Sequence, residues 1–283
     1  EASENLTTFW EHDALQVTQD KVNQLLNQRQ DRALEFLDVG CGPGGLSFRF
    51  AEKHSSESAN IHITATDLAD GMLDLVNNRL KEDSSLASII STVQMDGREL
   101  DKVADASVDV VGSNFGLSIF PQRERGWQSA HRVLKSGGVL FATAWDEESA
   151  NMTWVDRLTQ RFNAAAPDAE SEPLPMPSQT IGTDAERISK ELEAAGFENV
   201  EAFQTTHTVV QDAYAVIQNL LDNPAFIRYL ERLSREEFVE EVTSLLRAST
   251  SRRMRRQPGI AGKLGVAMFD MTAFTFVATK QAK

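Results

Sequence analysis

The sequence predicts an α/β fold built on a doubly wound, mostly parallel sheet. Three observations carry this prediction. Short apolar runs alternate with segments of helical spacing over residues 35–145, the first run leads into a glycine-rich turn, and acidic residues stand at three strand ends. Such alternation is typical of βαβ units, whose parallel strands present their carboxyl ends at one edge of the sheet.

The first half of the chain contains five predicted strands, separated by segments whose apolar residues recur at helical spacing. We expect strands at 35–39, 61–66, 89–95, 108–112 and 139–145, and helices at 6–30, 45–54, 71–80 and 127–134. Gly137 and Gly138 are expected to end the last of these helices, as glycines do at C-caps.

The second half has a different pattern. Four of its prolines fall within residues 166–183, which predicts a loop. Thr183 with Glu186 and Ser234 with Glu237 are predicted capping boxes, each opening a helix. The other expected elements are a helix at 151–166, strands at 199–206 and 268–279, and mostly helical residues between those strands.

The composition restricts partners and compartment. Asp and Glu total 42 against 28 Lys and Arg, for a net charge of −14. Binding to phosphate backbones needs a basic surface, so we expect no nucleic-acid partner. One cysteine suits a reducing compartment and cannot form a disulfide framework. No apolar run reaches the roughly 20 residues of a membrane helix and no signal pattern opens the sequence, so we expect a cytoplasmic protein without a membrane span.

The segment FLDVGCGPGG, residues 36–45, is compatible with two cofactors. Gly40, Gly42 and Gly45 fit G-x-G-x-x-G, the pattern that places a dinucleotide pyrophosphate at a helix N-terminus. S-adenosylmethionine has no phosphate. It carries an ammonium, a sulfonium, a carboxylate, a ribose and an adenine, so its site favours acidic side chains.

Three acids at strand ends favour S-adenosylmethionine: Asp38, Asp67 and Asp96. Asp67 lies 27 residues after Gly40, compared with about 20 for the ribose-binding acid of a dinucleotide fold. Asp38 and Asp96 have no role in the dinucleotide fingerprint. A nicotinamide cofactor stays as the alternative.

The segment DVGCGPG (38–44) resembles the first motif of class I S-adenosylmethionine-dependent methyltransferases. TATDLADGML (64–73) and QMDGREL (94–100) are similar to the second and third motifs, and residues 108–145 resemble the region around strands four and five. The resemblance covers roughly residues 30–145, together with AAGFENV (194–200) and FTFVATK (274–280). It is greatest to the small-molecule group around the ubiquinone/menaquinone-type enzymes.

The resemblance implies a seven-stranded sheet with an antiparallel final strand, and it assigns the cofactor residues. Asp38 and the glycine turn would surround the methionine part, Asp67 would hold the ribose and Asp96 the adenine amino group. Asn114 would face the transferred methyl. The implied set is Asp38, Gly40, Cys41, Gly42, Gly44, Asp67, Leu68, Met72, Asp96, Gly97 and Asn114. Cys41 is interpreted as a small residue that fits the turn.

Aromatic residues are expected to shape the acceptor pocket, namely Trp10, Phe115, Phe120 and Trp145. The methyl donor is already activated, so a base is needed only for a nucleophile that arrives protonated with a high pKa. Candidate bases are His12, Asp146 and His207. Catechol-type enzymes have a carboxylate where this chain has Asn114, so we expect no metal. The cluster Arg252–Arg256 is interpreted as a solvated helix face, with an anionic acceptor or an acidic partner surface as the alternative.

The predicted organisation is a single domain over residues 1–283, with a helical cap (1–30), a core (31–207), a helical insert (208–265) and a final strand (266–283). The predicted function is methyl transfer from S-adenosylmethionine to O, N or C of a small, partly apolar acceptor. An NAD(P)-dependent oxidoreductase and a non-catalytic methyltransferase-like binding protein are the alternatives. Both a monomer and a dimer are compatible with the sequence.

Overall fold

A computed structural model describes residues 7–28, 32–54, 61–167, 171–222, 226, 228–250 and 265–282. The chain divides into two compact units. The first contains residues 1–144, 184–205 and 274–283, and the second contains residues 145–183 and 206–273. The predicted single-domain organisation stays a prediction.

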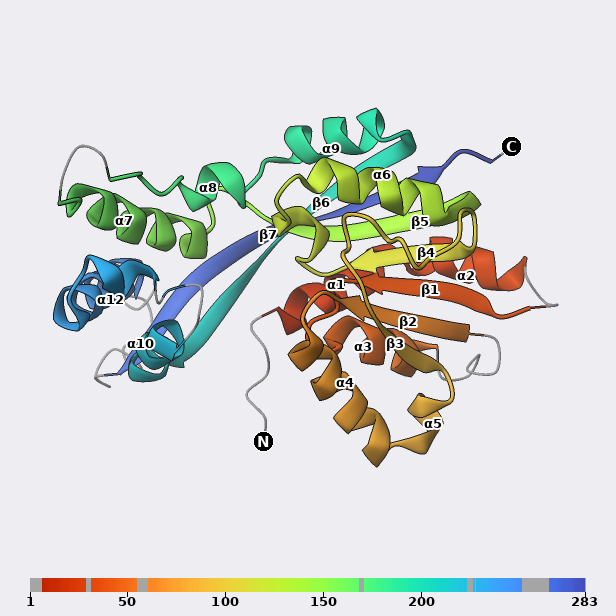
Figure 1. Cartoon of the computed structure of the whole chain (residues 1–283), viewed down its shortest axis with the longest axis horizontal. Helices are drawn as coiled ribbons and strands as arrows, with labels where there is room; N and C mark the ends of the chain where they lie inside the picture. Colours follow the sequence, from red (N-terminus) through yellow and green to blue (C-terminus); the bar gives the residue numbers. More distant parts are fainter. Residues whose placement is uncertain are drawn as a thin grey trace. The chain divides into compact units, whose positions relative to one another are not determined.

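One seven-stranded sheet runs in the order β3-β2-β1-β4-β5-β7-β6 (Figure 1). Its strands are β1 (Leu34–Val39), β2 (Ile61–Asp67), β3 (Ile90–Gln94), β4 (Val108–Ser113), β5 (Leu134–Trp145), β6 (Phe197–Asp212) and β7 (Val266–Lys280). The strand order reverses between β1 and β4, which is the switch point of a doubly wound sheet. The predicted fold class is confirmed.

Strand direction follows from the pairing register. β1 pairs in parallel with β2 and β4, β2 with β3, and β4 with β5. Side-chain hydrogen bonds join Asn199 to Thr279 and Thr208 to Asp270. The residue number rises along β6 as it falls along β7, so these two strands run antiparallel.

Helices cover both faces of the sheet in the first unit (Figure 1). One face packs against α1 (Thr8–Val17), α2 (Gln19–Asn27), α3 (Gly45–Lys53) and α4 (Asp70–Glu82), and the other against α6 (Arg123–Val133) and α9 (Ala185–Ala194). The short helix α5 (Ser84–Ala87) follows α4. Neighbouring residues on β1 show the division, because Phe36 is buried in one cluster and Leu37 in the other.

The N-terminal segment is helical as predicted, in the form of two helices that meet at Thr18, whose hydroxyl donates to the carbonyl oxygen of Ala14 at 2.6 Å. Two other local expectations were wrong. The helix before β5 ends at Val133, and Gly137 (φ 75°) lies in an irregularity within β5 instead of a C-cap. Asp184, not Thr183, caps α9 by accepting from the Arg187 amide.

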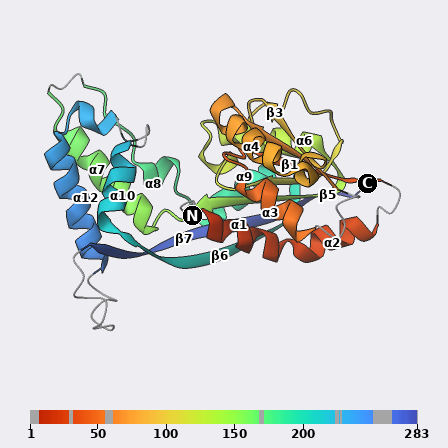
Figure 2. The same cartoon turned by 90° about the horizontal axis from the view of Figure 1, so that it is seen from below.

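The second unit contains α7 (Ala150–Ala164), α8 (Pro177–Thr180), α10 (Ala213–Asp222) and α12 (Arg235–Thr250), with one end of β6 and of β7. Both views show α7, α10 and α12 grouped together (Figures 1 and 2). The capping box at Ser234 and Glu237 is confirmed, because each side chain accepts a hydrogen bond from the other residue's amide. The cluster Arg252–Arg256 lies outside the described residues.

None of the described helices has the length and apolar character that crossing a membrane requires. Packing within the central sheet can be tested by a substitution.

Gly112 on β4 provides that test. A Cβ at this position would lie 2.7 Å from ring atoms of Phe36 and Phe141. Gly112→Ala is expected to lower the free energy of unfolding by about 1–3 kcal/mol through overpacking. Urea unfolding measures the change.

Gly71→Ala on α4 is the matched control, because a Cβ there meets nothing within 4 Å. This variant should be neutral or more stable by up to about 1 kcal/mol. Equal stabilities for the two variants would contradict the packing described for β4.

Candidate functional site

A cavity of about 280 Å³ opens at the carboxyl ends of β1, β2 and β4, within the first unit. Its wall is formed by Thr7 and Glu11 at α1, by the glycine turn after β1, by Asp67 at the end of β2, and by residues 114–120 after β4. This is the edge, and the switch point, at which open α/β sheets bind ligands.

The glycine turn is held close to its neighbours. Gly40 has φ 68°, which favours glycine, and a Cβ there would lie 3.0 Å from the ring of Phe120. The amide of Cys41 donates to the carbonyl oxygen of Thr66 on β2 at 2.8 Å. Burial and the charge of Asp38 raise the pKa of the Cys41 thiol, so the side chain stays neutral. The turn thus brings its backbone to the cavity wall.

Asp38 is the most buried acid of the site, with no exposed surface. Its Oδ2 accepts a hydrogen bond from the Ser47 hydroxyl at 2.6 Å, and its Oδ1 has no hydrogen-bond partner. Burial, together with the charges of Glu11 and Asp67, raises the pKa of Asp38 to about 7. A buried carboxylate oxygen without a partner is costly unless a ligand supplies one.

Asp67 connects β2 to the glycine turn. Its Oδ2 accepts from the Gly42 amide at 3.0 Å and its Oδ1 from the Ala69 amide at 2.9 Å. Each carboxylate oxygen can accept more than one hydrogen bond, so Asp67 retains acceptor capacity toward a ligand.

The loop after β4 has a fixed and strained conformation. Phe115 has φ 58°, which is rare for an aromatic residue, and its amide donates to the Thr143 hydroxyl at 2.8 Å. The same hydroxyl donates to Asn114 Oδ1 at 2.8 Å. Trp10 packs edge-on against Phe115 with ring centroids 5.8 Å apart. Asn114 and Phe115 are thereby held at the cavity wall.

Glu11 is a site residue that the sequence did not single out. It is 4% exposed, and its Oε2 accepts from Arg49 Nε at 2.8 Å. Burial raises its pKa, although Arg49 opposes the shift. The signal in the sequence is its place on the same helical face as Ala14 and Leu15, since an acid among apolar positions is unusual.

Part of the predicted site comes together at the cavity. The predicted residues that line it are Asp38, Gly40, Cys41, Gly42, Asp67, Asn114, Phe115 and Phe120. Gly44 lies just behind the turn, as the N-cap of α3 with φ 86°. Trp10 is buried behind Phe115 and does not line the cavity.

The remaining cofactor predictions fall beside the cavity. Leu68 is 63% and Met72 40% exposed. Asp96 is held by the Arg98 guanidinium, with the shortest contact at 2.6 Å, and this hydrogen bond lowers its pKa. A Cβ on Gly97 would lie 2.5 Å from the ring of Phe120, so this glycine allows the approach of that ring. The roles assigned to these four residues stay predictions.

The candidate bases and one aromatic are placed elsewhere. His12 is exposed, with Nε2 2.9 Å from Arg49 Nη1. Asp146 and His207 belong to the second unit, as does Trp145. Their roles also stay predictions. Among the described residues, no three His, Cys, Asp or Glu side chains are grouped so that they could hold a metal ion.

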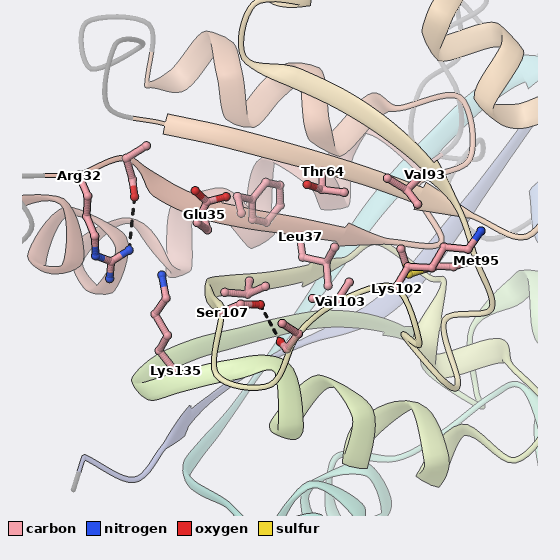
Figure 3. Close-up of a pocket in the computed structure, with 14 residues that line it drawn as sticks. Arg32, Glu35, Leu37, Thr64, Val93, Met95, Lys102, Val103, Ser107 and Lys135 are labelled. Carbon is pink, nitrogen blue, oxygen red and sulfur yellow. Dashed lines mark hydrogen bonds between the residues drawn. The ribbon is translucent and has the colours of Figure 1, made fainter.

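A second cavity, of about 500 Å³, extends from the amino-terminal ends of β1, β4 and β5 to Val93 and Met95 at the carboxyl end of β3. Figure 3 shows Arg32 and Lys135 at one end of it and Lys102 at the other. Arg32 and Lys135 both form ion pairs with the buried carboxylate of Asp109, at 3.1 and 3.0 Å. Arg32 and Lys135 neutralise Asp109 and lie near the amino-terminal ends of the strands. Ligands of open α/β sheets bind at the carboxyl ends, so we assign the functional site to the cavity that contains Asp38 and Asp67.

Comparisons with known proteins point to the same reaction class. Residues 37–142 match the model of a family described as a methyltransferase domain. The ubiquinone/menaquinone biosynthesis C-methyltransferase UbiE of Idiomarina loihiensis is 28% identical over 186 residues, which cover 63% of this chain and 72% of that protein. The UbiE of Rhizobium etli is 28% identical over 179 residues, 63% of this chain and 64% of its own length.

The fold has solved counterparts. The crystal structure of the YcgJ protein from Bacillus subtilis superimposes with a TM-score of 0.55 over 94% of this chain and all of that chain, at 14% identity. The oxidoreductase and the non-catalytic binding protein receive no support from these comparisons. The sequence matches therefore support an S-adenosylmethionine-dependent methyltransferase: residues 37–142 match a methyltransferase domain, and the chain is similar to the ubiquinone/menaquinone C-methyltransferases.

Proposed function

We propose that the cavity at the carboxyl edge binds S-adenosylmethionine and that the protein methylates O, N or C of a small, partly apolar acceptor. The observation that carries the proposal is the charge of the wall. Glu11, Asp38 and Asp67 are its titratable acids, and none of the lining residues is Lys, Arg or His. Such a wall suits a ligand that brings an ammonium and a sulfonium and no phosphate.

The order of the strands supports one orientation of the ligand. The strands β3, β2, β1 and β4 are neighbours in that order. One polar residue lies within two residues of the carboxyl end of each strand, in the same order: Asp96, Asp67, Asp38 and Asn114. We assign Asp96 to the adenine, Asp67 to the ribose, and Asp38 with the glycine turn to the methionine part. Asn114 is assigned to the region of the reacting methyl.

The fit to the ligand rests on Asp38. Its Oδ1 is buried, faces no hydrogen-bond partner, and belongs to a residue that lines the cavity. When bound, S-adenosylmethionine supplies an electrophilic methyl group on a cationic sulfur. The chain's own residues must then position the acceptor and exclude water.

The acceptor side is apolar. Phe115, Ile119 and Phe120 line the cavity on the β4 side, and they favour an acceptor with an apolar surface. The relatives are named C-methyltransferases, which favours carbon as the methylated atom. We further propose that the partner is a small molecule and not a nucleic acid, and that the protein acts in the cytoplasm.

Asp67 tests the cofactor proposal. Asp67→Ala is expected to weaken binding of S-adenosylhomocysteine by roughly tenfold or more, because a charge-assisted hydrogen bond is lost. Isothermal titration calorimetry measures the change. Asp74→Ala, which removes an exposed acid of α4 outside the cavity, is the control and should bind normally.

A screen with methyl-labelled donor tests the reaction itself. Phenols, quinones, amines and carboxylates are offered as acceptors, and label is expected in at least one product. In the calorimetry, loss of S-adenosylhomocysteine binding in Asp74→Ala, or unchanged binding in Asp67→Ala, would contradict the assignment of Asp67 to the cofactor.

The raised pKa of Asp38 predicts a pH-dependent gain in stability on neutralising this residue. The folded-state pKa is about 7 against 3.8 for the free group, so the folded state binds the proton more tightly. Ionisation then destabilises the fold progressively between about pH 4 and pH 7. Asp38→Asn should therefore raise the free energy of unfolding at pH 8. This gain should exceed the change that the same substitution causes at pH 5 by more than about 1 kcal/mol.

Asp96→Asn is the control of opposite sign. Arg98 lowers the pKa of Asp96, so its stabilising contribution is present at neutral pH and is lost as the pH falls. This variant should be less stable than the wild type at pH 8. Urea unfolding at both pH values checks the pair, and the same sign for both at pH 8 would refute the charge assignment.

A further inference from the structure

Glu11 places a second carboxylate beside Asp38 in the donor cavity. It reaches the cavity from α1, whereas the glycine turn and Asp38 come from β1. Its Oε1 lies 2.3 Å from the position of a Cβ built on Gly45, the first residue of α3. The Glu11 carboxylate therefore lies against the start of α3, next to the glycine turn assigned to the methionine part.

The hydrogen bonds of Glu11 leave acceptor capacity. Oε2 accepts from Arg49 Nε at 2.8 Å, while Oε1 has a long contact of 3.5 Å with Asn114 Nδ2. A carboxylate has about four acceptor positions, so Oε1 can accept a further strong hydrogen bond. Glu11 lies outside the segments that resemble family motifs, residues 38–44, 64–73 and 94–100.

Two carboxylates that share a cavity repel each other unless a cation lies between them. The charge of Glu11 contributes to the raised pKa of Asp38, and Asp38 Oδ1 is buried without a partner. Arg49 pairs with Glu11 and does not line the cavity. The pair of carboxylates thus lacks a hydrogen-bond donor at Asp38 Oδ1 and is complementary to an ammonium group.

We propose that Glu11 and Asp38 together bind the α-ammonium group of the methyl donor, so that α1 recognises the amino-acid arm of the cofactor. This inference rests on the proposed function. An ammonium group has three donors and can satisfy Asp38 Oδ1 and Glu11 Oε1 at once. The aliphatic carboxylate of the donor is excluded as the partner because both residues would repel it.

Calorimetry with two probes tests the inference. S-adenosylhomocysteine carries the amino-acid arm, and 5′-methylthioadenosine lacks it. Glu11→Gln should weaken binding of S-adenosylhomocysteine by roughly tenfold and leave binding of methylthioadenosine within roughly twofold. Glu52→Gln on α3 makes the same charge change at an exposed position outside the cavity and should change neither.

Arg49→Met separates binding from a structural role. If Glu11 binds the ammonium, removing Arg49 leaves that contact in place, and S-adenosylhomocysteine should bind within roughly threefold of wild type at pH 8. If Glu11 merely anchors α1 through Arg49, this variant and Glu11→Gln should weaken both probes alike. That result would overturn the inference.

A measurement on the wild type guards against a variant that does not fold. An analogue of S-adenosylhomocysteine with a hydroxyl in place of the α-amino group should bind roughly tenfold more weakly than the parent. Equal binding of parent and analogue would overturn the inference. Failure of the wild type to bind S-adenosylhomocysteine or methylthioadenosine would instead refute the proposed function.

Discussion

The burial of Asp38 at the carboxyl end of the central strand β1 is the interaction on which the site depends. One oxygen is satisfied by Ser47 and the other by no residue of the described chain. Burial raises its pKa to about 7, so the free protein holds an acid that is half ionised near neutral pH. A cationic ligand resolves this conflict, because it favours the charged form and supplies the missing donor.

The fold explains why the acids meet. Parallel strands end at one edge, and the cavity lies there, where the strand order reverses between β1 and β4. The turn after β1 is tied to β2 through Asp67 and the Gly42 amide. The strained conformation at Phe115 fixes the β4 side. The wall is therefore set by backbone contacts that exist before any ligand binds.

The strand-end acids and the glycine turn could be predicted because they follow from local patterns. Alternating strands and helices place Asp38 and Asp67 at one edge, whatever the details of packing. Glu11 could not be assigned in the same way, since its role depends on α1 folding back onto α3, a long-range contact. The strand irregularity at Gly137 could not be predicted from the sequence, because a helix end and a strand irregularity both favour a positive φ. The second unit has no motif that relates its residues to chemistry.

The proton balance of donor binding tests the central claim most directly. Titration of the wild type with S-adenosylhomocysteine at pH 7, in buffers of different ionisation enthalpy, measures the protons exchanged. If an ammonium binds at Asp38, the pKa of this acid falls from about 7 and a fraction of a proton is released per site. The release should vanish in Asp38→Asn. Proton uptake, or binding without exchange in the wild type, would contradict the account.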